Sequence, residues 1–211
     1  MKKNVNVEEL LGRYNQLEGC KDDILAAIKI MEECYNSDGK VLIAGNGGSA
    51  SDALHIVGEL MKSFVLKRKL NQKICNALDD TAKDSIYLKN NLQMALPAIA
   101  LVNEVALTTA YSNDVASDLV FAQQVLGYAK VGDVLLGIST SGNSQNIIYA
   151  AEVAKAMGMK VVGLTGKNGG ELKDFCDVCI KVPENETYKI QELHLPIYHT
   201  ICLELERSIF G

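Results

Sequence analysis

Short runs made almost entirely of apolar residues recur along the chain, and a helical pattern separates each run from the next. The runs are 41–44, 98–101, 134–138, 161–164 and 178–180. Strands that are apolar on both faces are typical of parallel sheets with helices covering both sides. The sequence therefore predicts an α/β fold, namely a three-layer, doubly wound sheet of five parallel strands. In such a fold, ligands bind at the carboxyl ends of the strands.

Two further segments are expected around this sheet. Residues 7 to about 36 carry apolar positions at helical spacing, and a turn at Asp38-Gly39 follows, so we expect residues 1–39 to form an N-terminal helical segment packing on a core of residues 40–211. Residues 65–96 interrupt the alternation, which predicts an insertion over one end of the sheet. A lid is one interpretation of the insertion, and a solvated surface helix is the simpler one. The last helix, about 188–209, contains Pro196, which should kink it.

The composition limits the ligands and the compartment. The net charge of −5 argues against a general surface for nucleic acids or anionic membranes, so local donors would have to hold an anionic substrate. The six cysteines are scattered through apolar segments, and Cys176 and Cys179 form a lone CxxC, which we interpret as packing. We find neither a signal peptide pattern nor a membrane-spanning run in the sequence, and we expect a cytoplasmic protein.

One strand ends in a cluster of hydroxyl residues. The run 134–138 is followed by the hydroxyl-rich stretch 139–144, and a helical pattern follows that stretch. A junction of strand, turn and helix presents unpaired N–H groups and the positive end of a helix dipole to an anion. One or two hydroxyls would fit a helix cap, but four favour a phosphate ester as ligand. The four hydroxyl residues are Ser139, Thr140, Ser141 and Ser144.

A second loop rich in glycine follows the first strand at 45–49. It lacks the GxGxxG spacing, and no acidic residue ends a second strand, so it is not the dinucleotide fingerprint. Two such loops in one sheet indicate a small phosphorylated ligand. The candidate contacts in this loop are Asn46, Gly47 and Ser49.

The helices supply a few chemically active side chains. His55 and Glu59 lie one turn apart on one face, where they can bind a divalent metal or share acid–base work, although such a pair is often only a surface contact. In the last helix, Gln191 and His199 are about 80° apart around the axis, close enough for one site given the kink. His194 is about 140° from His199. We interpret His194 as a partly buried histidine or a subunit contact.

Taken together, these motifs resemble the sugar isomerase (SIS) domain family, and within it the phosphoheptose isomerases, which convert sedoheptulose 7-phosphate to a heptose 7-phosphate. The similarity runs from about Val41 to the C-terminus, outside 65–96. It is carried by GNGGS at 45–49, His55 with Glu59, GDVLLGISTSGNS at 132–144, LTGKNGG at 164–170, and Gln191 with His199.

The resemblance implies the SIS fold, a homotetramer with sites between subunits, and a role for each motif. The phosphate would be held by Ser49, Ser139, Thr140, Ser141 and Ser144, and Gln191 would be a further substrate contact. One Zn²⁺ ion would be bound by His55, Glu59, Gln191 and His199. Glu59 and His199 would also form the catalytic acid–base pair. Aldose–ketose isomerisation moves a proton between adjacent carbons through an enediol, so it needs an acid and a base, and a metal that polarises the carbonyl assists it.

Three positions depart from the family pattern at places where the family contacts substrate. Ser63 stands where arginine is usual, and Glu104 and Tyr188 stand where aspartate is usual. Glu104 stays a candidate substrate contact, and Lys62 or a basic residue of the insertion would replace the arginine. We therefore expect a phosphosugar aldose–ketose isomerase for sedoheptulose 7-phosphate. The alternatives are an isomerase of another phosphosugar and a non-catalytic phosphosugar-binding regulator, and the presence of both Glu59 and His199 argues against the regulator.

Overall fold

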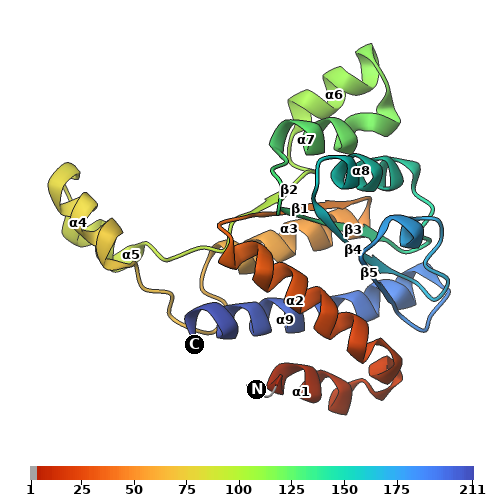
Figure 1. The fold of residues 1–211 in the computed structure, drawn as a ribbon, viewed down its shortest axis with the longest axis horizontal. Helices are drawn as coiled ribbons and strands as arrows, with labels where there is room; N and C mark the ends of the chain where they lie inside the picture. Colours follow the sequence, from red (N-terminus) through yellow and green to blue (C-terminus); the bar gives the residue numbers. More distant parts are fainter. Residues whose placement is uncertain (1–3) are drawn as a thin grey trace.

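A sheet of five parallel strands forms the centre of the computed structural model, which describes residues 4–211 (Figure 1). The strands are β1 (Val41–Gly45), β2 (Ala98–Ala100), β3 (Val134–Ser139), β4 (Lys160–Thr165) and β5 (Val178–Lys181), in the order β2-β1-β3-β4-β5. Gly45 of β1 pairs with Ile138 of β3, so these two strands end side by side. The predicted doubly wound α/β fold is confirmed.

Helices cover both faces of this sheet. One face carries α2 (Lys21–Asn36), α3 (Gly48–Met61) and α9 (Thr187–Phe210), with α1 (Val5–Arg13) and the short helix η1 (Asn15–Cys20) beyond them. The other face carries α7 (Val120–Tyr128) and α8 (Gln145–Ala156), with α6 (Val105–Asp114), η2 (Ser117–Leu119) and η3 (Leu172–Phe175) beside them. No helix within residues 4–211 is long and apolar enough to cross a membrane.

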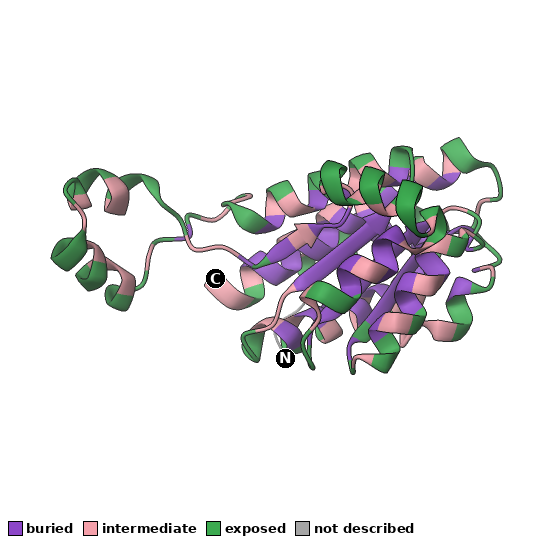
Figure 2. Ribbon diagram, turned by 90° about the horizontal axis from the view of Figure 1, so that it is seen from above, coloured by how far each residue is buried: buried purple, intermediate pink, exposed green. Residues whose placement is uncertain are grey.

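The apolar strands are explained by two separate cores, one on each face. Val41 and Ile43 of β1 point into the core beneath α2, α3 and α9, whereas Leu42 and Ala44 point into the core beneath α7 and α8. Successive side chains of a strand point to opposite faces, so a sheet covered on both sides needs apolar residues at every position. Figure 2 shows these buried segments running along the centre of the molecule.

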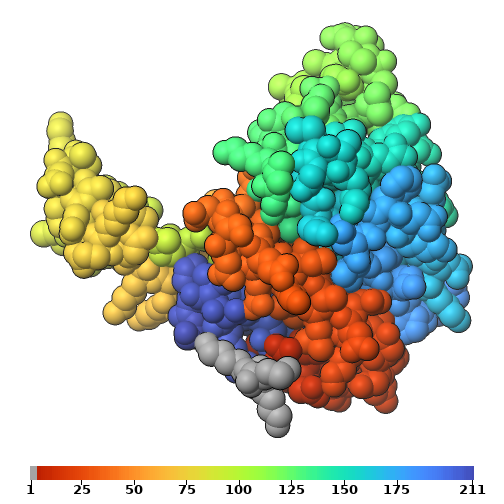
Figure 3. All heavy atoms as spheres, viewed as in Figure 1, coloured from red at the N-terminus to blue at the C-terminus, as the bar shows by residue number. Residues whose placement is uncertain are grey.

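Residues 70–92, called the arm here, leave this body. Their helices α4 (Gln72–Thr81) and α5 (Ser85–Asn91) contain no buried residue and pack mainly on each other. Figures 1 and 3 show the arm projecting away from the body, and not lying over the end of the sheet. Asn71 and Asp84 cap the two helices by accepting the backbone N–H groups of Ile74 and Tyr87.

The N-terminal helical pattern is divided, whereas the last helix is continuous. The helical pattern of residues 7–36 is divided into α1, η1 and α2, because the backbone at Tyr14 leaves the helical region with φ −131° and ψ 69°. Pro196 lies inside α9, which continues as one helix from Thr187 to Phe210.

Candidate active site

A cavity of about 280 Å³ lies where β1 and β3 end. Helix α3 begins at Gly48 and α8 begins directly after Ser144, so two helix N-termini border the cavity and favour an anion there. Its lining consists of small or uncharged residues from three segments: Asn46, Gly47, Gly48, Ser49, Ile138, Ser139, Thr140, Ser144, Thr187 and Gln191. The structure thus brings most of the predicted phosphate contacts together. Thr187 was not predicted, because the sequence gives no signal that the start of α9 reaches these loops.

The hydroxyl groups of residues 139–144, called the serine loop here, point towards two different cavities. The Oγ atoms of Ser139 and Ser144 lie 3.0 Å apart, and the N–H of Gly142 donates to Ser139 Oγ at 3.1 Å. Ser141 instead accepts the N–H of Asn143 at 3.1 Å and lines a neighbouring cavity of about 220 Å³, which Thr140 also borders. The first cavity is therefore the better candidate for the phosphate, with Ser141 outside its lining.

Close packing explains two of the glycines. A Cβ at Gly48 would lie 2.4 Å from Nε2 of Gln191, so the absence of a side chain at Gly48 lets α9 approach the glycine-rich loop at 45–49. Gly142 has φ +68°, and a Cβ there would lie 2.0 Å from the carbonyl oxygen of Gly169. The loop at 164–170 therefore packs directly against the serine loop at Gly142.

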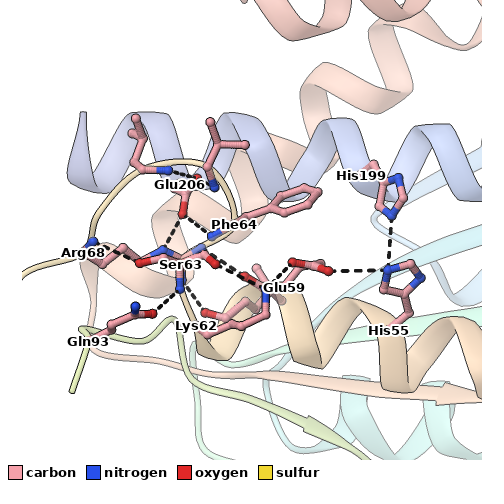
Figure 4. A network of polar contacts seen from close by, with 12 residues as sticks. His55, Glu59, Lys62, Ser63, Phe64, Arg68, Gln93, His199 and Glu206 are labelled. Carbon is pink, nitrogen blue, oxygen red and sulfur yellow. Dashed lines mark hydrogen bonds and ion pairs between the residues drawn. The ribbon is translucent and has the colours of Figure 1, made fainter. Parts of the chain in front are cut away.

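Three predicted catalytic or metal-binding residues meet between α3 and α9. His55 Nε2 lies 3.4 Å from Glu59 Oε1 and 3.4 Å from His199 Nε2 (Figure 4). The ring of Phe64 lies against His199, with centroids 5.6 Å apart. Burial and the neighbouring His55 lower the pKa of His199, which favours a neutral imidazole at pH 7.

Two residues that the sequence did not single out orient His55. Its Nδ1 lies 3.0 Å from the hydroxyl of Tyr198, and this hydroxyl donates to Asp52 Oδ1 at 3.3 Å. Since an ionised carboxylate only accepts, the hydrogen bonds assign the proton of His55 to Nδ1 and leave the Nε2 lone pair facing Glu59 and His199. Burial raises the pKa of Asp52. Asp52, His55 and Glu59 are spaced to lie on one face of a helix, and this spacing is the sequence signal that would have identified Asp52.

The basic candidates occupy different places. Lys62 Nζ donates to Glu59 Oε2 at 3.0 Å, so Lys62 lies beside the cluster formed by His55, Glu59 and His199. Arg68 points inward and pairs with Glu206. Ser63 stabilises the root of the arm, because its N–H donates to Oε1 of Gln93 and its Oγ accepts from the N–H of Arg68.

Three further positions that the sequence singled out do not line the 280 Å³ cavity. Glu104 occupies the N-cap position of α6 and Tyr188 is 57% exposed on α9, and neither is among the residues lining the 280 Å³ cavity. His194 is fully buried within the chain, with Nε2 3.3 Å from the carbonyl oxygen of Thr165. His194 is therefore a fully buried core residue, and not the partly buried histidine or subunit contact that we expected.

The donor types at the cluster suit a zinc ion, although the full predicted ligand set is not assembled. Two imidazoles and a carboxylate are typical zinc ligands, and the Nδ1 contact of His55 is the kind of outer bond that orients a ligating histidine. Gln191, which was also predicted as a substrate contact, lines the 280 Å³ cavity and lies about 12 Å from His199 along α9. Within residues 4–211, no group of three or more His, Cys, Asp or Glu has the arrangement of a metal site.

An anion cavity beside an acid–base cluster, at the strand ends of a doubly wound sheet, defines a protein that acts on a small phosphorylated ligand. The SIS domain model matches residues 6–91 and 77–166. The phosphoheptose isomerase of a Nitratiruptor species is 42% identical over 185 residues, which are 88% of this chain and 86% of that protein.

Solved structures agree with this result. A phosphoheptose isomerase from Francisella tularensis superposes with a TM-score of 0.76 at 32% identity, covering 98% of this chain and 97% of that one. Phosphoheptose isomerase GmhA from Neisseria gonorrhoeae gives 0.69 at 32% identity, covering 94% and 98%. The chain belongs to the SIS domain family, in its branch of phosphoheptose isomerases. The predicted family and type of enzyme are confirmed.

Proposed function

We propose that this chain interconverts sedoheptulose 7-phosphate and an aldoheptose 7-phosphate. One observation carries the proposal: α9 links the 280 Å³ cavity to the cluster of His55, Glu59 and His199. Gln191 of α9 lines the cavity, and His199 of α9 belongs to the cluster. A phosphate bound in the cavity would leave the carbonyl end of an open-chain sugar to reach the cluster.

The proton transfer follows from the residues at the cluster. The Glu59 carboxylate accepts the proton from C1 of the ketose, while the N–H of the neutral His199 imidazole gives its proton to the carbonyl oxygen at C2, which yields an enediol. Glu59 then returns its proton to C2, and His199 takes the proton from the oxygen at C1, which yields the aldose. Both residues end in their starting states. Lys62, bonded to Glu59 Oε2, holds this carboxylate at the site.

A zinc ion is part of this proposal. His55, Glu59 and His199 would hold it, with Gln191 as the proposed fourth ligand. When bound, zinc would polarise the substrate carbonyl and stabilise negative charge on its oxygen. Dialysis against a chelator should lower kcat, and added Zn²⁺ should restore it. Full activity of the metal-free protein would show that these four residues act without a metal, through hydrogen bonding and proton transfer alone.

We also propose a homotetramer in the cytoplasm. Leu54 and Met61 on α3 and Leu195 on α9 are 42%, 46% and 42% exposed, and they lie on the two helices that carry the cluster. Large apolar side chains in such places favour contact with another subunit. The free cysteines fit a reducing compartment.

The experiment that tests the substrate is a panel of ketose phosphates with five, six and seven carbons, followed by detection of the aldose product. We expect the highest kcat/KM with sedoheptulose 7-phosphate. A higher value with a shorter sugar would support an isomerase of another phosphosugar, an alternative favoured by the engagement of Ser63 in backbone contacts. No turnover with any sugar would overturn the proposed activity and favour a binding protein.

A further inference from the structure

A buried ion pair lies directly behind the catalytic cluster. The side chains of Arg68 and Glu206 are 0% and 1% exposed, and Arg68 Nε donates to Glu206 Oε1 at 2.7 Å (Figure 4). Arg68 comes from the root of the arm, and Glu206 comes from the C-terminal part of α9. The guanidinium is also stacked over the ring of Phe210 at 5.1 Å.

Glu206 orders the segment that follows α3. One carboxylate oxygen accepts the N–H of Phe64 at 2.8 Å, and the other accepts those of Val65 and Leu66 at 2.8 and 2.9 Å. Burial by itself would raise the pKa of Glu206, but these donors and Arg68 outweigh burial and hold the pKa below its usual value. The ionised carboxylate therefore fixes Phe64, whose ring contacts His199.

Arg68 holds the end of α3 on the other side of the pair. Its Nη2 donates to the carbonyl oxygen of Glu59 at 3.0 Å, and its Nη1 donates to that of Leu60. Carbonyl groups in the last turn of a helix lack partners within the helix, and a cation there also complements the helix dipole. The backbone of the proposed base is thus bonded directly to Arg68.

We propose that the Arg68–Glu206 pair is a positioning device that sets Glu59 and Phe64 against His199. A buried ion pair adds little net stability over a well-packed neutral pair, because desolvation offsets the attraction. The pair fixes the end of α3, the segment 64–66 and α9 with respect to one another, and small displacements of reacting groups lower rates strongly. The proposal rests on the proposed isomerase activity.

The test compares kcat, KM and the free energy of unfolding in Arg68→Lys and in the double variant Arg68→Met with Glu206→Gln. Lysine keeps the charge but cannot make the fork of contacts to Glu59, Leu60 and Glu206. The double variant leaves no uncompensated buried charge, so it should fold stably. We expect kcat to fall about tenfold or more in both variants, with KM within about twofold of wild type.

The Lys40–Asp133 pair, in which Asp133 is buried and the Lys40 side chain is 18% exposed, supplies the control. Asp133 is 1% exposed and accepts the N–H groups of Lys40 and Lys130 at 3.0 and 2.8 Å, at the start of β3 and away from the cluster. Asp133→Asn should lower stability and leave kcat unchanged. Wild-type kcat in a folded Arg68 variant, or a kcat that only follows stability across all three variants, would overturn the positioning role. An inactive wild type would instead overturn the proposed reaction.

Discussion

Ser144 and Ser141 lie three residues apart in one loop but face different cavities. Ser144 Oγ, next to Ser139 Oγ, is placed to donate to a phosphate in the larger cavity. A hydrogen bond to a charged group contributes about 1.5–3 kcal/mol, so Ser144→Ala should raise KM about tenfold or more with little effect on kcat. Ser141→Ala is the matched control and should raise KM less. Steady-state kinetics of both variants would check this, and a larger effect at Ser141 would place the phosphate in the smaller cavity.

His194 predicts how stability depends on pH. Burial lowers its pKa to about 4, although the nearby Thr165 carbonyl raises it somewhat. The unfolded chain, with an ordinary pKa near 6.5, binds more protons between these values, so stability is lost as the pH falls from 6.5 towards 4. The loss amounts to about 3 kcal/mol at the lower limit. Urea unfolding at pH 7.5 and 5 should show a smaller pH dependence for His194→Asn than for wild type; equal dependence would contradict this.

The sequence singled out the residues proposed to contact the ligand, but not the residues that position them. Ser139, Ser144, His55 and Glu59 stand beside turns or at helical spacing, and that spacing is visible in the chain. The contact between Arg68 and Glu206 joins residues 138 positions apart, and no local pattern reports it.

At the scale of elements, the arm is joined to the body through a narrow stalk. The N–H of Met94 donates to the carbonyl of Arg68 at 2.9 Å, and Ser63 N–H donates to Gln93 Oε1, so the two chain segments meet at the root. Their closeness means that a short linker can join them. The apolar runs predicted each strand, whereas the direction of the arm depends on contacts at its root and could not be read from its helical pattern.

Replacing residues 70–92 with a short Gly-Ser linker should leave the body folded. The helices of the arm bury no residue, so we expect the melting temperature to change by less than about 4 °C, equivalent to roughly 1 kcal/mol. Thermal unfolding followed by circular dichroism would measure this. A broad, non-cooperative transition would show that the arm contributes to the core.

At the scale of the whole molecule, the sheet assembles a site from distant parts of the chain. The neighbouring strands β1 and β3 lead into the two loops that line the 280 Å³ cavity, and α9 runs from these loops to His55 and Glu59 on α3. The winding reverses at β1, which is where doubly wound folds bind ligands. The sequence could predict the cavity from this rule, but it could not predict that Gln191 lies apart from His199.

Glu59 is the group proposed to transfer a proton between adjacent carbons of a sugar phosphate. The most direct measurement is NMR of sedoheptulose 7-phosphate in D₂O with wild type and with Glu59→Gln. Wild type should form the aldose and exchange carbon-bound hydrogen at C1 or C2 for deuterium. Glu59→Gln should do neither, while it still folds and binds the phosphate ester. Turnover or exchange by Glu59→Gln at the wild-type rate would contradict the account.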